Sequence, residues 1–225
     1  METIVLSVGG SIIAPDKPDY FFLKEFKNFI INNLNKYKFI IVCGGGKTSS
    51  YYNSAAKRVS DISDENLDYL GIAATKLNSE LVRVIFGDYA YENVIHDPTK
   101  KIITNKKIII ASGWKPGRST DYIAVYLGNK LGAKKILNLT NIEYVYDKDP
   151  RSNKDAKKLF NISWKEFRKI VGNKWTPRLN SPFDPIASIE AQKNKMSVII
   201  LKGTNLKNIQ DYFEGKAFIG TIIEK

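Results

Sequence analysis

The stretch Lys38-Phe39-Ile40-Ile41-Val42-Cys43-Gly44-Gly45-Gly46-Lys47-Thr48 decides how this chain folds. It begins with an apolar run typical of a buried strand, and its three glycines allow positive φ angles and close approach of a ligand to the backbone. A helix is predicted from about Ser49, and a helix start offers unpaired N–H groups to an anion. We therefore expect a phosphate-binding loop here. A tight turn without a ligand is the alternative that this stretch leaves open.

Two further strand-like runs end in the same way, in glycine and hydroxyl residues. Residues 3–8 lead into Gly9-Gly10-Ser11, and residues 107–111 lead into a loop over residues 112–121. Strands and helices alternate along the sequence, which predicts a three-layer α/β sandwich with a mainly parallel sheet. In such sheets ligands bind beyond the carboxyl ends of the strands. We therefore expect the three junctions to meet in one site.

The loop after the third of these strands carries the clearest physical sign of a bound anion. Lys115 and Arg118 stand just before the next predicted helix. Cations at a helix N-terminus oppose its dipole unless an anion lies between them. Ser119 and Thr120 also have a simpler explanation, because hydroxyl residues are preferred N-caps. Asp121 is read equally well as an N-terminal acid of the helix or as a ligand contact.

The spacing of apolar residues predicts the other elements. A long helix that ends at Gly87 is expected to bury one face, and Ser163 with Glu166 three residues later predicts a capped helix start. The residues expected on the buried face of the long helix are Leu67, Leu70, Ala74, Leu77, Leu81, Val84 and Ile85. Further helices are expected at residues 22–34, 123–131, 186–191 and 205–213, and further strands at residues 135–139, 197–201 and 218–223.

The composition fits a globular protein. The chain has 225 residues, 43% of them hydrophobic, which suits one large domain or two closely packed lobes. Its single cysteine and single histidine exclude an internal disulfide and a metal site built from these ligands. We expect Cys43 to be a buried structural thiol, and we assign no role to His96, which stands in a turn-like surface stretch. No leader or membrane-spanning run is visible, so we expect a soluble, cytoplasmic protein.

The charge and the missing motifs limit the function. Lysine and arginine number 35 against 23 acidic residues, a formal net charge of +12, which favours anionic partners. The basic residues are scattered, so a nucleic-acid role would rest on charge alone. Gly44-Gly45-Gly46-Lys47-Thr48 does not have the glycine spacing of a P-loop. The sequence also contains no dinucleotide-binding fingerprint, no nucleophile elbow and no protein-kinase catalytic loop. Several phosphate junctions at one edge instead predict two phosphorylated ligands held end to end.

Taken in order, these residues resemble the amino acid kinase superfamily and, within it, the archaeal-type uridylate kinases. The landmarks are Val8-Gly9-Gly10-Ser11, Cys43 to Lys47, Asp68 to Ile72, Pro116 to Asp121, Thr140-Asn141 with Tyr146, Asp149-Pro150 and Asp184-Pro185. The resemblance implies one amino acid kinase-like domain over residues 1–225, with UMP on the N-terminal side and ATP on the side from about residue 135. It also implies transfer of the γ-phosphoryl group from ATP with Mg²⁺ to UMP, giving UDP, in a cytoplasmic homohexamer.

The resemblance further implies roles for single residues. Catalysis is expected to use Lys47, Lys115, Arg118 and Asp184, the last as an organiser of the site or its metal. The residues expected to bind ATP are Ser7, Val8, Gly9, Gly10, Ser11, Gly45, Thr140, Asn141, Tyr146 and Asp149. The residues expected to bind UMP are Gly44, Asp68, Trp114, Lys115, Pro116, Gly117, Arg118, Ser119 and Thr120, with Asp68 on the ribose hydroxyls. No residue is assigned as a direct metal ligand.

Three positions depart from the superfamily pattern. Ser7 stands where many members carry a lysine, and Ser50 stands where an arginine is common. Glu143-Tyr144 replaces the usual Asp-Gly pair, which puts a bulky side chain near ATP. The cation that stabilises the transition state is therefore expected from the three catalytic candidates named above, and the departures favour weak activity or an altered substrate.

Two other functions stay open. An isopentenyl phosphate kinase-like enzyme would be expected to carry a histidine in or after the second glycine loop, and residues 47–54 contain none. A non-catalytic nucleotide-binding or sensing protein is favoured by Ser7 and Ser50, which remove two expected phosphate contacts.

Overall fold

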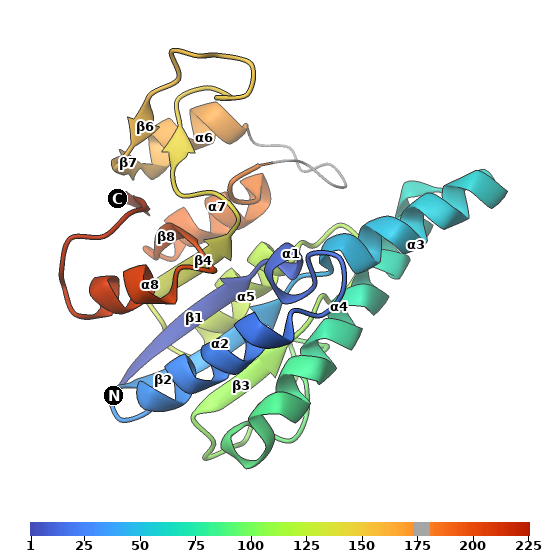
Figure 1. Ribbon diagram of the computed structural model, residues 1–225, viewed down its shortest axis with the longest axis horizontal. Coiled ribbons are helices and arrows are strands. Elements are labelled where there is room, and N and C mark those ends of the chain that lie inside the picture. The colour runs from blue at the N-terminus through green and yellow to red at the C-terminus, as the bar shows by residue number, and fades with distance from the viewer. Residues whose placement is uncertain (173–180) are drawn as a thin grey trace.

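Seven strands form the central sheet of the computed structural model, which describes residues 1–172 and 181–225 (Figure 1). Their order across the sheet is β3-β2-β1-β4-β8-β9-β7, and every neighbouring pair is parallel except β8 with β9. The bounds are β1 Glu2–Val8, β2 Tyr37–Cys43, β3 Ile108–Ala111, β4 Lys135–Thr140, β7 Asn161–Ser163, β8 Ser197–Lys202 and β9 Thr221–Glu224. The predicted α/β class with a mainly parallel sheet is confirmed.

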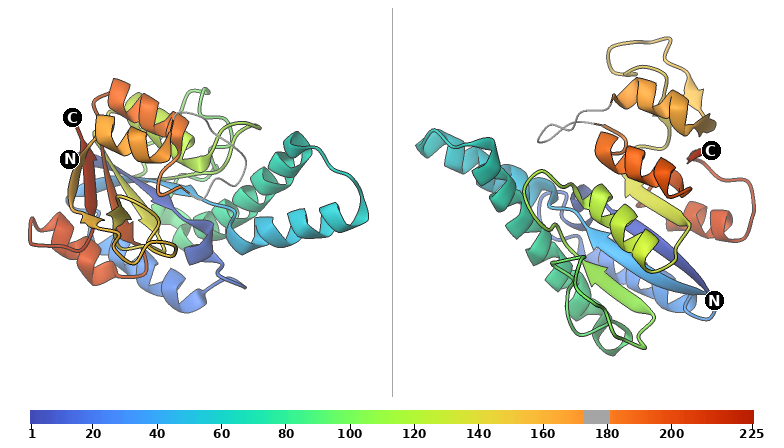
Figure 2. Two further views of the ribbon diagram at one scale, coloured as in Figure 1. Left: turned by 90° about the horizontal axis from the view of Figure 1, so that it is seen from above. Right: turned by 180° about the vertical axis from the view of Figure 1, so that it is seen from behind.

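Helices cover both faces of the sheet (Figures 1 and 2). Helices α2, α4 and α8 pack into the hydrophobic cluster on one face, and α5, α6 and α7 into the cluster on the other. The bounds are α1 Gly10–Ile13, α2 Tyr20–Asn32, α3 Gly46–Val59, α4 Asp64–Phe86, α5 Thr120–Lys130, α6 Trp164–Val171, α7 Pro185–Lys193 and α8 Leu206–Phe213. Because both faces are covered, the strands read as continuous apolar runs.

A helical hairpin made by α3 and the first half of α4 projects beyond the sheet (Figure 2). In α3 only Asn53 is buried. The root of this hairpin lies where α3 begins, directly after β2, so the glycine loop joins the projecting arm to the sheet. A short antiparallel ribbon, β5 Val145–Tyr146 with β6 Lys158–Leu159, lies outside the main sheet.

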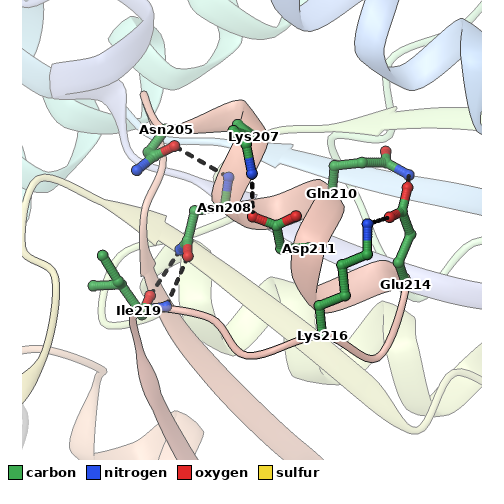
Figure 3. Close-up of polar contacts among 8 residues, drawn as sticks. All are labelled: Asn205, Lys207, Asn208, Gln210, Asp211, Glu214, Lys216 and Ile219. Atoms are coloured by element: carbon green, nitrogen blue, oxygen red, sulfur yellow. Dashed lines mark hydrogen bonds and ion pairs between the residues drawn. The ribbon is translucent and has the colours of Figure 1, made fainter.

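The segment after α8 is held by polar contacts that set the position of β9 (Figure 3). Asn205 caps α8 by accepting a hydrogen bond from the backbone N–H of Asn208 at 3.1 Å. The buried amide of Asn208 accepts from the N–H of Ile219 at 2.7 Å and donates to its carbonyl at 2.8 Å. One side chain therefore satisfies both backbone groups of Ile219.

The prediction for the buried face of α4 was wrong in part. Leu77 and Val84 are 63% and 62% exposed. Polar residues take their place inside, because Asn78 donates a hydrogen bond to the carbonyl of Gly44 at 2.8 Å and Ser79 donates to that of Ala111 at 2.9 Å. These two side chains of α4 satisfy backbone carbonyls at the ends of β2 and β3. The spacing of apolar residues does not reveal polar residues that are buried in this way.

Other local predictions had mixed outcomes. Helix α4 ends at Gly87 with a φ of 53°, and Ser163 and Glu166 form the expected capping box. Helix α3 starts at Gly46, earlier than expected. His96 is half-buried, not fully on the surface, and its Nδ1 lies 2.8 Å from the hydroxyl of Ser112. Within the part of the chain that the structure describes, no helix has the length and apolar character of a membrane span.

Candidate active site

Two glycine loops at the carboxyl ends of β1 and β2 touch each other backbone to backbone. A Cβ atom on Gly10 would lie 2.1 Å from the nitrogen of Gly46 and 2.6 Å from the oxygen of Gly44. Gly46 also has a φ of 57°, which side chains disfavour. The first two predicted junctions therefore form a single surface at the start of α3.

A cavity of about 350 Å³ opens beside this surface. It lies between the start of α3, the first half of α4, the loop before α5 and the start of α7. The lining residues are Gly45, Gly46, Ser49, Ser50, Asn53, Leu67, Asp68, Gly71, Ile72, Thr75, Gly113, Lys115, Arg118, Ser119, Thr120, Asp121, Ser181 and Asp184. The structure thus brings the third predicted junction to the same place as the first two.

Helix α4 anchors the loop that precedes α5. The carboxylate of Asp68 accepts a hydrogen bond from the N–H of Gly117 at 3.0 Å, and the hydroxyl of Thr75 accepts from the N–H of Gly113 at 2.9 Å. Asp68 was expected to contact a ligand, and in this structure one of its oxygens holds the loop. Thr75 was not predicted, because its partner is 38 residues away.

Two of the three predicted cations line the cavity, each over an aromatic ring. The Nζ of Lys115 lies 4.1 Å from the ring centroid of Trp114, and the guanidinium carbon of Arg118 lies 4.7 Å from that of Tyr122. Cation–π contacts of this kind are worth about 0.5–1 kcal/mol at exposed sites, so an anion can displace them. Lys47 is exposed, lies 5.8 Å from the ring centroid of Tyr51 and does not line the cavity.

Asp121 joins the end of β1 to the starts of α5 and α7. Its Oδ1 accepts a hydrogen bond from the hydroxyl of Ser7 at 2.9 Å, and its Oδ2 accepts from the backbone N–H of Asp184 at 3.1 Å. Desolvation raises the pKa of Asp121 to about 6, with a further contribution from Asp184, while the Ser7 hydroxyl acts in the opposite direction. The cap of α5 is Ser119, while Asp121, which the sequence left open between an N-terminal acid and a ligand contact, lies in the first turn of α5 and lines the cavity.

Asp184 is buried and caps α7. Its Oδ1 accepts from the N–H of Ala187 at 2.6 Å. Burial raises its pKa, and the nearby Ser119 hydroxyl and Arg118 lower it in part, although Arg118 forms no ion pair with it. Its Oδ2 has no hydrogen-bond partner among the described residues. The described residues contain no group of three or more His, Cys, Asp or Glu side chains placed for a metal.

The residues expected to bind ATP follow the ends of β1 and β4. The N–H of Gly9 donates to the carbonyl of Leu139 at 2.8 Å, which joins the two strand ends. Val8 is buried in the core, whereas Asn141 is exposed directly after β4. The remaining members lie at the start of α1 (Ser11), at the end of β4 (Thr140), in β5 (Tyr146) and in the exposed turn beyond it (Asp149).

Two side chains near the predicted ATP site, those of Asp149 and Tyr144, already have partners within the protein. The guanidinium of Arg151 binds both carboxylate oxygens of Asp149 and lowers the pKa of that carboxyl to about 2. Tyr144 was expected to place bulk near ATP. Its side chain is instead buried, edge-on to Phe160 with ring centroids 5.3 Å apart.

Comparisons with known proteins agree with this geometry. The model of the amino acid kinase family matches residues 2–202. The uridylate kinase of Thermococcus kodakarensis is 32% identical over 224 residues, covering 98% of this chain and 99% of that protein, and the uridylate kinase of Pyrococcus abyssi is 33% identical with the same coverage. The crystal structure of uridylate kinase from Archaeoglobus fulgidus superposes with a TM-score of 0.83 at 29% identity, covering 99% of this chain and 100% of that one.

Proposed function

This chain belongs to the amino acid kinase family, and from that premise we propose that it is a uridylate kinase. It transfers the γ-phosphoryl group of ATP to UMP and releases UDP and ADP. The observation that carries the proposal is the cavity in which a helix start, an acid and two cations converge. Its volume of about 350 Å³ suits a mononucleotide-sized ligand.

UMP occupies this cavity in the proposal. Its phosphate lies near the start of α3 and the loop before α5, where backbone N–H groups, Lys115 and Arg118 supply positive charge. Both cations leave their aromatic rings to meet it. Asp68 stands on the α4 wall and accepts hydrogen bonds from the ribose hydroxyls. Gly44 and the loop from Trp114 to Thr120 complete the UMP site.

ATP binds on the side of β4 and β5, where the C-terminal part of the chain from about residue 135 begins. The loops at the ends of β1 and β4 hold its phosphates, with Gly45 facing the transferred group. Thr140, Asn141, Tyr146 and Asp149 border its purine and ribose. The contact between the two glycine loops fixes donor and acceptor at one distance, and positioning of this kind supplies most of the catalysis in phosphoryl transfer.

Charge stabilisation in the transition state falls to Arg118 and Lys115. Ser7 donates its hydrogen bond to Asp121, so the end of β1 supplies no cation of its own. Asp184 at the start of α7 would help to organise Mg²⁺ bound with ATP, which would supply positive charge against the phosphates. The side chain of Lys47 is exposed and does not line the cavity, so any contribution of Lys47 to catalysis comes from outside the cavity. We also propose that the protein is cytoplasmic and that it forms a homohexamer. Light scattering of the purified chain tests the number of subunits.

The test is ADP release from ATP-Mg²⁺ with UMP, CMP, AMP, isopentenyl phosphate or no acceptor. Release that depends on UMP supports the proposal, and equal or faster release with isopentenyl phosphate contradicts it. A non-catalytic nucleotide-binding protein is the second candidate, favoured by the hydroxyl groups of Ser7 and Ser50 where cations were expected. It would show no release with any acceptor, while UMP at 100 times its Kd would still stabilise the fold by about 2.7 kcal/mol.

A further inference from the structure

Helix α3 buries one polar side chain, and the oxygen of that side chain lacks a hydrogen-bond partner. Asn53 is 5% exposed and is the only buried residue of α3. Its Nδ2 lies 3.4 Å from the hydroxyl oxygen of Ser49, which is a long contact, and its Oδ1 has no partner among the described residues. Because buried side-chain oxygens are nearly always hydrogen-bonded, this atom needs a donor from outside the protein.

Asn53 lies on the wall of the cavity that the proposal gives to UMP. Ser49 stands one turn earlier on the same face of α3, and it lies against α4, since a Cβ on Gly71 would be 3.2 Å from its hydroxyl oxygen. A short connector joins the two helices, so α4 runs back along α3 (Figure 2). One turn further along α3 therefore brings Asn53 level with Leu67 and Asp68, which also line the cavity.

The chemistry of the amide limits which part of UMP Asn53 can contact. Its Oδ1 accepts hydrogen bonds, whereas a phosphate group offers acceptor oxygens of its own. The ribose carries two neighbouring hydroxyls, each of which can donate. In the proposed orientation the ribose lies at Asp68, and one oxygen of Asp68 already accepts the N–H of Gly117 at 3.0 Å. An acceptor on the facing helix therefore gives the second hydroxyl an oxygen of its own.

We propose that Asn53 is a specificity-determining residue of the acceptor site, which accepts a hydrogen bond from one ribose hydroxyl of UMP while Asp68 accepts from the other. The inference deepens the proposed function and rests on it for the identity of the nucleotide. The terminal torsion of asparagine is broad, so the amide turns its Oδ1 toward the cavity when the ribose arrives. A nucleotide without this hydroxyl leaves the oxygen unpaired and is therefore rejected.

UMP, 2′-deoxy-UMP and 3′-deoxy-UMP together isolate the contact with the ribose. Isothermal titration calorimetry gives the Kd of each nucleotide for the full chain. We expect the unmodified chain to bind at least one deoxy nucleotide about tenfold or more weakly than UMP. In Asn53→Ala the Kd of UMP should rise at least about fivefold, and that of the deoxy nucleotide without the contacted hydroxyl should stay within about twofold. The other deoxy nucleotide keeps this hydroxyl and should lose affinity as UMP does.

Folding does not limit this test. Alanine is favoured over asparagine within a helix, and the amide makes only the long contact with Ser49 within the described residues, so Asn53→Ala should keep or raise the Tm. The matched control is Asn66→Ala, which removes an exposed amide near the start of α4, outside the cavity-lining set. It should leave every Kd within about twofold of the unmodified chain.

The alternative outcomes are distinct. Equal loss of affinity for all three nucleotides in Asn53→Ala would place the contact elsewhere on UMP and overturn the inference, as would a Kd that the substitution leaves unchanged. If UMP-dependent ADP release is normal in the unmodified chain, either result shows that only the role of Asn53 is wrong. The expected pattern of Kd values without any acceptor-dependent release would support the ribose contact and contradict the kinase. Failure to bind UMP at all would contradict both.

Discussion

At the scale of single residues, the positive charge of the cavity depends on two exposed side chains, Lys115 and Arg118. Arg118 is exposed; its guanidinium packs on the ring of Tyr122 and donates one local hydrogen bond, to the carbonyl of Gly117 at 3.1 Å. Arg118→Ala should therefore lower kcat at least about tenfold, the order expected for loss of a charge that stabilises the transition state. Steady-state kinetics with UMP measure this.

The control for that change is Arg58→Ala, which removes an exposed arginine near the end of α3, outside the cavity-lining set. Its kcat should stay within twofold of the parent chain. Unaltered turnover in Arg118→Ala would remove Arg118 from the mechanism and leave Lys115 as the cation of the site.

Cys43 gives a prediction about pH. Burial raises the pKa of its thiol to about 12, with a smaller opposing effect from the Ser79 hydroxyl. Since the folded pKa lies above the unfolded one, this contribution to stability is complete below about pH 8.5 and is lost as the pH rises toward 12. The free energy of unfolding should fall above pH 9 with a slope of up to about 1.4 kcal/mol per pH unit from this group.

Urea titrations at pH 8, 9, 10 and 11 measure the slope, and Cys43→Ala is the comparison. The alanine variant is expected to be less stable at pH 8 but to lose stability more slowly above pH 9. Tyr212, whose pKa burial also raises to about 12, keeps a residual slope in both chains. Parallel curves for the two chains would contradict the assignment.

At the scale of residues, the sequence predicted features that depend on near neighbours in the chain. It did not predict contacts between residues that are far apart in the chain. The glycine loops, Lys115, Arg118 and the cap at Ser119 follow from neighbours in the chain. The contact between Ser7 and Asp121 joins positions 114 residues apart, and no spacing rule reveals it.

At the scale of elements, the crossing of the glycine loops is the most demanding contact in the site. Gly10→Ala would place a methyl group 2.1 Å from the nitrogen of Gly46, against backbone that cannot move without displacing the start of α3. We expect loss of several kcal/mol of stability, the range of severe overpacking, and loss of acceptor binding. Chemical denaturation and UMP titration measure the two effects.

Gly71→Ala is the matched control, because it also lies on the cavity. There the new methyl group meets only the hydroxyl of Ser49, at 3.2 Å, which is a side chain that can rotate. Gly71 lies within α4, where alanine is favoured over glycine by about 1 kcal/mol. Stability should therefore hold or rise. A Gly10→Ala chain as stable as the Gly71→Ala chain would show that the loops are not rigidly packed.

Elements were predictable when their own residues determine them. The capping box at Ser163 and the stop at Gly87 were both found from local sequence. The two- and three-residue strands β5, β6 and β7 were missed, since such short strands exist only through the partners beside them. The buried side of α4 was misjudged because Asn78 and Ser79 are buried by hydrogen bonds and not by apolar character.

At the scale of the whole molecule, the net charge of +12 should act on anionic substrates at a distance. Salt screens such interactions, with a Debye length of about 10 Å at 0.1 M. Raising KCl from 0.05 to 0.5 M should therefore increase KM for UMP by about threefold or more, with little change in kcat. Initial rates at matched osmolality, with sucrose as the uncharged control, measure this. A KM that is independent of salt would limit the charge effect to direct contacts.

The order of strands across the sheet has a consequence for how the protein is made. Strand β1 lies inside the finished sheet between β2 and β4, and on the β4 side its residues Ile4 to Val8 pair with Lys135 to Leu139. During synthesis β2 and β3 emerge long before β4, so this edge of β1 stays open over a very apolar run. Unpaired apolar edges promote aggregation. Until residues 135–139 have been translated, this edge therefore exposes the nascent chain to aggregation, well before the start of α7 exists to complete the site.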